Sequence, residues 1–207
     1  MAKEKVPLQR LEDFLPPGTY ESVADYLNRY CVQLTVTRSR QSILGDYRHA
    51  WKEKGHRISV NGNLNKFSFL ITLLHELAHL LTFDQHANRV SPHGSEWKSN
   101  FSALLADFLQ QGVFPKDIAE TLKRSLKSPA ASTCGDPDLL RVLRLYDKKK
   151  ADVYTVETLE KGTVFHIKGG RTFILEEKIR TRYKCRELET GKYFLFNGLY
   201  EVKLKSD

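Results

Sequence analysis

The chain has 207 residues, of which 41% are hydrophobic and 28% are charged, a balance that is typical of soluble globular proteins and excludes a disordered chain. This length allows one sizeable domain or two small ones, each with a hydrophobic core. The formal net charge of +8 favours a polyanionic partner, with nucleic acid the first candidate, although solubility alone would also account for the charge.

Cysteine content and apolar segments bear on the compartment. Cys31, Cys134 and Cys185 are too few and too scattered for a disulfide framework, and no C-x-x-C pair exists for a zinc ribbon. The first residues lack the apolar core of a secretory signal, and the most apolar segment, residues 67–83, is interrupted by two histidines and a glutamate. We therefore expect a cytoplasmic protein in reducing surroundings, with no membrane partner.

The first 146 residues predict helices combined with a small sheet. Helical spacing of apolar residues, with capping and stop signals, predicts helices over residues 8–17, 19–31, 65–83, 95–112 and 114–128. Alternation of apolar and polar residues predicts strands over residues 32–39 and 56–61, with an irregular edge strand or hairpin arm over residues 40–55. Ser95 is the expected N-cap of its helix, and residues 129–138 are expected to form a loop.

The composition changes after residue 146. Residues 152–205 are rich in Val, Tyr, Thr, Phe and Ile and are interrupted by glycines, which predicts four or five short antiparallel strands. We therefore divide the chain into a mixed domain, residues 1–146, and a small antiparallel β-module, residues 147–207. The predicted fold class is α+β.

The helix predicted over residues 65–83 contains the pattern H-E-x-x-H. His75 and His79 are four residues apart, so they lie on one helix face and can direct two imidazoles at one metal ion. A zinc ion lowers the pKa of a bound water from about 16 to about 7. Glu76 is placed to take the proton of such a water and return it to a leaving amine. The alternative is a coincidence on a core helix, but buried histidines without a metal would need other hydrogen-bond partners.

A catalytic zinc site usually has three protein ligands and one open position, so a third ligand is needed. His93 lies just before the next predicted helix, where a loop can fold it back over the first helix. Glu96, one turn further along, is an alternative ligand. His86 is another, although it lies close to His79 and misses the H-E-x-x-H-x-x-G-x-x-H spacing by one residue. We predict one zinc ion per chain.

"HELAHLL", residues 75–81, followed by "PHGSEWK", residues 92–98, resembles the SprT-like family of zinc metallopeptidases. This family includes the bacterial SprT proteins and the eukaryotic protease Spartan. The resemblance covers roughly residues 20–125 and implies a zincin-like metallopeptidase domain, with the H-E-x-x-H pattern on the active-site helix. It implies a catalytic base, Glu76, and three zinc ligands, His75, His79 and His93.

The resemblance has two further implications. Gly94 and Trp97 belong to the signature that orients the third ligand, although a core anchor is an equally simple role for the tryptophan. Many members continue into a zinc ribbon of paired cysteines, whereas "YKCRE" in this chain has Cys185 alone. We therefore expect a metal-free β-module in place of the ribbon.

The segment "EEKIRTRYKCRE", residues 176–187, has five basic residues at every second position: Lys178, Arg180, Arg182, Lys184 and Arg186. In a single strand these five would share one face, opposite Ile179, Thr181, Tyr183 and Cys185. Such a face can follow a phosphate backbone while neighbouring aromatic rings stack on bases. The alternative is a solvated face of an amphipathic strand.

Together these patterns predict a zinc-dependent metalloprotease that hydrolyses peptide bonds of protein substrates. For Spartan, the resemblance implies substrates that are crosslinked to DNA, which the basic β-module would contact. One alternative is a nucleic-acid-associated binding protein with a structural zinc. Another is a narrow processing peptidase with no DNA role, whose basic tail docks an acidic protein. Glu76 discriminates against a structural zinc, which has no use for a base beside it. Tyr47, Arg48 and His49 lie in the strand region expected beside the cleft, but their spacing assigns them no role.

Overall fold

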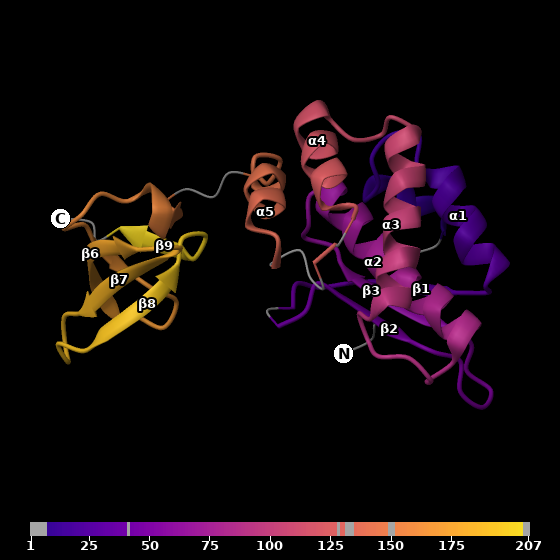
Figure 1. Ribbon diagram of the computed structural model, residues 1–207, viewed down its shortest axis with the longest axis horizontal. Coiled ribbons are helices and arrows are strands. Elements are labelled where there is room, and N and C mark those ends of the chain that lie inside the picture. The colour runs from indigo at the N-terminus through magenta and orange to yellow at the C-terminus, as the bar shows by residue number, and fades with distance from the viewer. Residues whose placement is uncertain (1–7, 41, 128, 131–134, 149–151, 205–207) are drawn as a thin grey trace. The chain divides into compact units, whose positions relative to one another are not determined.

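The structure is a computed structural model that describes residues 8–40, 42–127, 129–130, 135–148 and 152–204. The chain forms two compact units, Met1–Asp147 and Lys148–Asp207 (Figure 1). Helices and a small sheet build the first unit and an antiparallel sheet builds the second, so the predicted α+β class is confirmed.

The N-terminal unit combines helices with a three-stranded sheet. Its elements are η1 Leu8–Asp13, α1 Tyr20–Arg29, β1 Gln33–Thr37, β2 Gly45–Arg48, β3 Arg57–Asn61, α2 Lys66–His86, α3 Ser95–Gln110, α4 Lys116–Ser125 and α5 Pro137–Arg144. The strand order is β1-β3-β2, with β1 parallel and β2 antiparallel to the central strand β3. Strand β2 is therefore an edge strand. Helix α2 contacts both α3 and the strands β2 and β3 (Figure 1).

Helix α2 is the centre of this unit's core. It begins after Asn65, whose side chain accepts a hydrogen bond from the backbone N–H of Ser68 at 2.9 Å. Its leucines at positions 70, 73, 74 and 77 are fully buried, and each stabilises the fold by about 1.5–3 kcal/mol. By length and composition alone α2 is apolar enough to cross a membrane, but most of it is buried inside the protein, as in the core helix of a globular domain.

Most of the predicted elements of this unit are confirmed, with two corrections. Ser95 is the first residue of α3, and the N-cap is Gly94. The loop expected over residues 129–138 ends early, because Asp136 caps a helix that begins at Pro137 by accepting a hydrogen bond from Leu139 N–H at 3.0 Å. Residues 131–134 of that prediction lie outside the described residues. Helix α5 was missed, although an N-cap aspartate before a proline is a helix-start signal.

The C-terminal unit is a six-stranded antiparallel sheet. Its elements are β4 Tyr154–Thr155, η3 Val156–Thr158, β5 Val164–His166, β6 Thr172–Ile179, β7 Arg182–Glu187, β8 Tyr193–Asn197 and β9 Glu201–Leu204. The strand order is β4-β9-β5-β6-β7-β8, so the sheet has six strands where four or five were predicted. Phe165, Phe173 and Cys185 are fully buried in a core separate from that of the first unit.

The single basic strand predicted over residues 176–187 is wrong. The segment is a hairpin in which Ile179 of β6 pairs directly with Arg182 of β7, so Arg180 and Thr181 form a two-residue turn. Arg180 has a φ of 53°, a conformation that such turns usually give to glycine. The start of the segment ends β6 and its second half forms β7, where Tyr183 and Cys185 are buried on one face.

The hairpin also separates the five cations. Arg182, Lys184 and Arg186 share the outward face of β7, whereas Arg180 lies in the turn. Lys178 belongs to β6 and pairs with Tyr183, so it shares the other face, with its Nζ 5.5 Å from the tyrosine ring centroid. The five basic side chains therefore do not form one row.

Candidate metal centre

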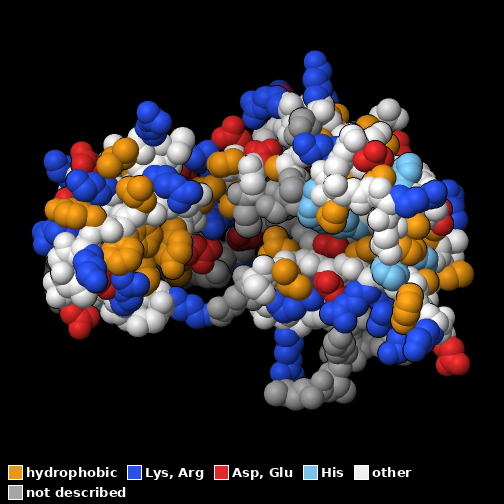
Figure 2. Space-filling model, turned by 60° about the horizontal axis from the view of Figure 1, so that its bottom comes forward, with side chains coloured by type: hydrophobic (Ala, Val, Ile, Leu, Met, Phe, Trp, Pro, Cys, Tyr) orange, Lys and Arg blue, Asp and Glu red, His pale blue; other side chains and the backbone are white. Residues whose placement is uncertain are grey.

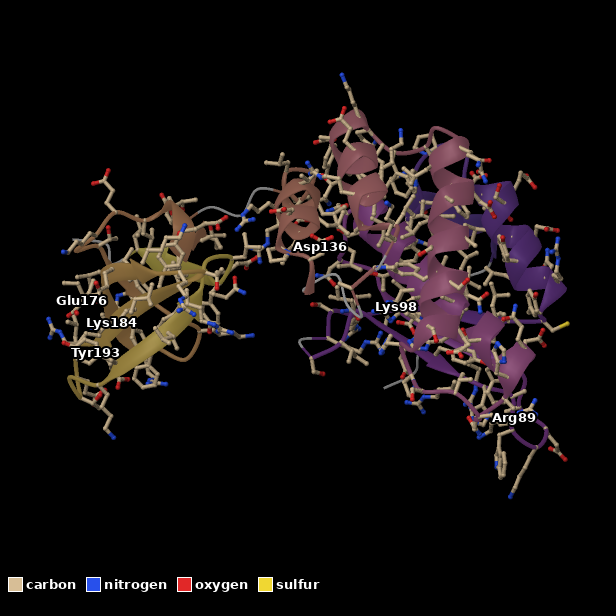
Figure 3. The ribbon with its side chains drawn as sticks, in the orientation of Figure 1. Arg89, Lys98, Asp136, Glu176, Lys184 and Tyr193 are labelled. Atoms are coloured by element: carbon tan, nitrogen blue, oxygen red, sulfur yellow. The ribbon has the colours of Figure 1, made fainter. Side chains whose placement is uncertain are left out.

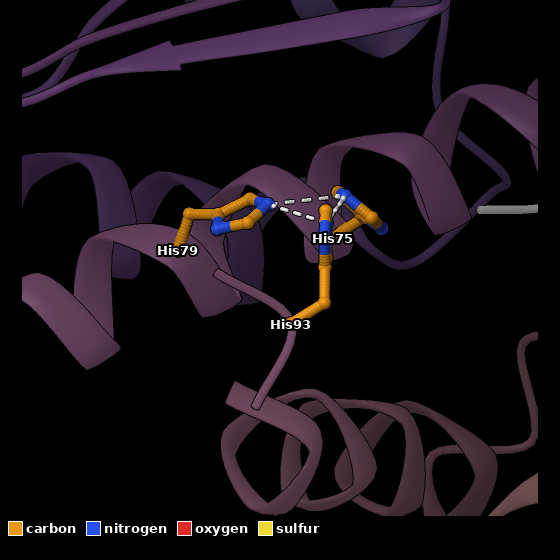
Figure 4. Close-up of side chains that lie close together, drawn as sticks. All are labelled: His75, His79 and His93. Atoms are coloured by element: carbon orange, nitrogen blue, oxygen red, sulfur yellow. Dashed lines mark hydrogen bonds between the residues drawn. The ribbon is translucent and has the colours of Figure 1, made fainter. Parts of the chain in front are cut away.

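Three histidines of the N-terminal unit converge on one point (Figure 4). His75 and His79 lie one turn apart on α2, and His93 lies in the loop that leads into α3. The Nε2 atoms of His75 and His79 are 3.2 Å apart, and the Nε2 of His93 lies 3.2 Å from the first and 3.0 Å from the second. The loop before α3 thus places the imidazole of His93 next to those of His75 and His79, which the helical repeat places on one face of α2.

Hydrogen bonding among the three nitrogens cannot account for this arrangement. Each imidazole nitrogen is either a donor or an acceptor, so at least two of the three Nε2 atoms have the same role and repel each other. A cation resolves the conflict, because all three then act as acceptors of one positive charge. Two nitrogen ligands of a tetrahedral zinc at about 2.0–2.1 Å lie about 3.3–3.4 Å apart, close to the spacing found. The three residues therefore fit a metal ion.

The electrostatic environment keeps the three rings neutral. Burial, and then the neighbouring His79 and His93, lower the pKa of His75 to about 3. Burial and then His93 lower the pKa of His79 to about 4, and burial lowers the pKa of His93. Neutral imidazole is the form that binds a metal ion, so the site is in its ligating state at pH 7.

Trp97 packs against all three rings. This fully buried indole has its ring centroid 4.7 Å from His75, 5.4 Å from His79 and 4.7 Å from His93. His93 itself has a φ of 57°, a left-handed conformation that costs a residue with a side chain about 1 kcal/mol or more. The loop therefore keeps a histidine at a position where the backbone favours glycine or asparagine, as expected for a functional side chain.

Glu76 lies beside the histidines but points toward β2. Its side chain is 6% exposed and accepts a hydrogen bond from the backbone N–H of Tyr47. Burial, and then the charge of Asp46, raise the pKa of Glu76 to about 8, against the opposing effects of Arg40 and the Tyr47 N–H. Figure 2 shows histidine side chains gathered on one face of this unit, with acidic side chains beside them. A buried carboxylate next to three converging imidazoles can accept and release a proton.

The comparison with known families agrees with this geometry. Residues 21–112, which include all three histidines and Glu76, match the SprT-like family. This chain carries a SprT-like domain. The interpretation drawn from residues 75–81 and 92–98 is therefore confirmed at the level of the family.

Curated relatives match the same domain. Protein SprT of Klebsiella pneumoniae subsp. pneumoniae is 40% identical over 81 residues, which cover 37% of this chain and 46% of the relative. Protein SprT of Klebsiella pneumoniae strain 342 is 35% identical over 102 residues, which cover 42% of this chain and 58% of the relative. The chain thus spans about half the length of the curated relatives it matches. No solved structure matches it significantly.

The two alternative ligands lie apart from the histidine cluster of the SprT-like domain. Among the described residues, the group of side chains that can hold one metal ion contains neither Glu96 nor His86. The Glu96 carboxylate instead accepts a hydrogen bond from its neighbour Ser95 at 3.0 Å. Gly94 caps α3 next to His93, and a side chain there would lie 3.0 Å from the carbonyl oxygen of Ser91, so the loop is tightly folded at this residue.

The structure shows the contacts of Tyr47, Arg48 and His49, the three residues in and beside β2 to which the sequence assigned no role. Tyr47 supplies the backbone N–H to Glu76, and its hydroxyl lies 2.8 Å from Nδ1 of His56. Arg48 pairs with Asp46, and the His49 ring stacks on Phe83 of α2 with centroids 4.5 Å apart. The backbone contact of Tyr47 had no sequence signal, because any residue except proline offers an N–H.

The basic residues of the C-terminal unit do not join a comparable cluster. Lys184 Nζ lies 3.1 Å from a carboxylate oxygen of Glu177 and 4.6 Å from the centroid of the Tyr193 ring. Arg186 Nε lies 2.8 Å from a carboxylate oxygen of Glu176, and Figure 3 shows Glu176, Lys184 and Tyr193 close together on neighbouring strands. Two of the three cations on the outward face of β7 are thus neutralised locally.

Proposed function

We propose that the SprT-like domain is a zinc-dependent peptidase that hydrolyses peptide bonds of protein substrates. The observation that carries this proposal is the convergence of three Nε2 atoms within 3.0–3.2 Å beside a buried carboxylate. One zinc ion per chain would be held by His75, His79 and His93, and Glu76 would act as the base.

The donor set favours zinc over the alkaline-earth ions. Three neutral imidazoles without a carboxylate suit zinc and other transition metals, whereas magnesium and calcium prefer oxygen ligands. Three protein ligands leave a tetrahedral ion one position for water or substrate, as in catalytic rather than structural sites. When bound, zinc would supply Lewis-acid polarisation and a water of lowered pKa.

Glu76 performs the proton transfers in this proposal. Its carboxylate takes a proton from the attacking water and delivers it to the amide nitrogen that leaves, so no free acid or base is needed. The Tyr47 N–H keeps the carboxylate oriented during both transfers. A cation held by the neighbouring histidines favours the ionised form of Glu76, which opposes the effect of burial on its pKa.

The edge strand β2 supports an extended polypeptide as substrate. The backbone N–H of Asn61 bonds the Leu44 carbonyl, so in the alternating antiparallel pattern Gly45 and Tyr47 direct their backbone groups away from β3. An extended chain can pair with such an edge through the backbone groups of Gly45 and the Tyr47 carbonyl, because the Tyr47 N–H is bonded to Glu76. Ile43 and Trp51, in the segments that flank this strand, are 43% and 65% exposed and offer apolar contacts to substrate side chains.

The proposal extends to proteins that are bound or crosslinked to DNA. It rests on the net charge of +8 and on Arg180 and Arg182, which are exposed at the β6–β7 turn. Among the described residues these two cations have no ion-pair partner, so they are available to phosphates. In this scheme the β-module would raise the local concentration of DNA-held substrate near the peptidase.

Metal content and cleavage of an unfolded protein substrate, with and without DNA, test the proposal. We expect one zinc per chain and metal-dependent cleavage. Glu76→Gln should bind zinc as the wild type does and lose about 10²–10⁴-fold in turnover, because the amide keeps the shape of the side chain but cannot take a proton. A wild-type protein that binds one zinc and cleaves no unfolded substrate would instead be a binding protein with a structural metal.

A further inference from the structure

Gly45, the first residue of β2, lies against Glu76 with no room for a side chain. A Cβ atom at this position would overlap Oε1 of Glu76, and it would lie 2.9 Å from Cγ of Glu76 and 2.8 Å from Cγ2 of Thr72. Non-bonded carbon atoms are in favourable contact at about 3.5–4.0 Å. The base is therefore packed directly on the bare backbone of the edge strand.

The backbone conformation does not require glycine at this position. Gly45 is absent from the glycines with positive φ, and it lies in an extended strand that any residue can adopt. Six other glycines of the described chain do have positive φ, and all six have open space where a side chain would be. Gly45 is the opposite case, in which space and not conformation excludes a side chain.

Neither helix α2 nor strand β2 can easily move to make room for a side chain at residue 45. On one side, Glu76 belongs to the same helical turn as His75 and His79, so a shift of α2 would move two of the three converging nitrogens. On the other side, the chain leading into β2 is fixed by Arg40 and Asn61. Nδ2 of Asn61 donates to the carbonyl oxygens of Arg40 and Ile43 at 3.1 and 3.0 Å, and Nε of Arg40 donates back to Asn61 Oδ1 at 2.8 Å.

We propose that Gly45 is a positioning residue for the reaction: its missing side chain forms the slot that holds the Glu76 carboxylate between α2 and β2. The Tyr47 N–H, two residues along the strand, fixes the orientation of the carboxylate within that slot. A methyl group at residue 45 pushes the carboxylate away from this donor while the histidines keep their places. This inference rests on the proposed peptidase function, in which Glu76 is the base.

Gly45→Ala and Gly55→Ala are a matched pair for testing the slot. A Cβ on Gly55, in the connection between β2 and β3, would have as its nearest atom the Cys31 carbonyl oxygen at 3.6 Å, an ordinary contact. We expect Gly45→Ala to bind one zinc and to lose about 10²-fold in kcat with little change in KM, because a displacement of about 1 Å costs that much. Gly55→Ala should match the wild type. A wild-type kcat in Gly45→Ala overturns the inference.

A double-mutant cycle of Tm measurements tests the same slot without an activity assay. In a Thr72→Ser background, which removes the clashing Cγ2 methyl group of Thr72 but keeps the hydroxyl, Gly45→Ala should lower the Tm of the metal-free protein. The same substitution should lower it far less when Glu76 is replaced by Ala, because the overlapping atoms are gone. Equal losses in both backgrounds would overturn the slot. A zinc-bound wild type without peptidase activity would refute the proposed function instead, and the cycle would still report on the slot.

Discussion

In the N-terminal unit three half-buried histidines face one another with no consistent set of hydrogen bonds, whereas in the C-terminal unit a buried carboxylate is matched by its neighbours. Glu187, 4% exposed, accepts hydrogen bonds from Arg171 Nε at 2.5 Å and from the Thr190 hydroxyl. The Arg171 side chain is 45% exposed, and its guanidinium also lies 4.7 Å from the ring centroid of Phe194. Both clusters are polar, but only the first lacks a matched set of hydrogen bonds.

This difference distinguishes a candidate metal site from a structural ion pair. A buried polar group that is satisfied by its neighbours contributes to the fold and needs no ligand. Three converging nitrogens of which at least two have the same hydrogen-bonding role raise the energy of the fold in the absence of a cation, and the left-handed backbone at His93 adds to this cost. Substitutions in the first cluster should therefore change chemistry with little loss of stability, and substitutions in the second should do the reverse.

The largest expected effect is the loss of metal from His93→Gly. We expect metal affinity to fall by at least about 10²-fold, since removing a ligand costs more than disturbing its surroundings. The metal-free variant should have a Tm equal to or above that of the metal-free wild type, because glycine adopts a φ of 57° without strain. His166→Ala, in the C-terminal unit, is the control and should keep one zinc. Full zinc content in His93→Gly would contradict the three-histidine site.

Arg171→Met should give the opposite pattern, with normal zinc content and a lower Tm for the C-terminal unit. The hydrogen bond from Arg171, and then that from Thr190, lower the pKa of Glu187 in the folded state. A carboxylate with a depressed folded-state pKa stabilises the fold above its unfolded pKa of about 4.3, and this contribution disappears as pH falls through the folded value. The Tm difference between variant and wild type should thus be present at pH 7 and shrink below pH 4. A difference that does not depend on pH would argue against the pair.

The first cluster is predictable from sequence only as far as local geometry reaches. The helical repeat places His75 and His79 together whatever the rest of the fold, so the H-E-x-x-H pattern suffices for two ligands. The third ligand depends on how the loop after α2 folds, and spacing alone left His93, Glu96 and His86 as candidates. Gly45 in strand β2 and Glu76 in helix α2 are far apart in the sequence, and no local sequence pattern predicts their contact.

The basic hairpin was mispredicted for a related reason. Strict alternation from Lys178 to Arg186 favours a single strand, because the usual turn residues are absent from the segment. The chain nevertheless turns at Arg180, with a positive φ, since the hairpin buries Tyr183 and Cys185 against the aromatic core of this unit. Tertiary burial thus overrode the local turn preference.

A smaller effect is expected from the cations of this hairpin. If the unit binds DNA, Arg180→Ser with Arg182→Ser should flatten the log–log salt dependence of binding by about 1.4–1.8, because each phosphate that is no longer neutralised reduces the slope by about 0.7–0.9. Lys184→Ser with Arg186→Ser removes cations that Glu177 and Glu176 already neutralise, so it should flatten the slope less. Titration at several salt concentrations measures both slopes. Equal slopes for wild type and both variants would leave the hairpin as a solvated surface.

The smallest effect concerns the end of the N-terminal unit. Asn65, the N-cap of α2, also donates through Nδ2 to the Leu143 carbonyl at 2.9 Å and to Asp147 Oδ1 at 2.6 Å. A fragment of residues 1–148 keeps the aspartate and a fragment of residues 1–146 omits it. Because this hydrogen bond is exposed, its removal should cost about 0.5–1 kcal/mol, which lowers the Tm by about 1–4 °C.

Zinc content and cleavage of a short peptide should be the same in both fragments and in the full chain. The buried core of this unit runs from Leu11 to Leu143, so neither cut removes a core residue. The comparison of the two fragments therefore isolates one capping interaction of the helix that carries His75 and His79. A fragment of residues 1–148 that loses zinc or activity would show that the metal centre depends on the C-terminal unit, and the separation of the two clusters would then fail.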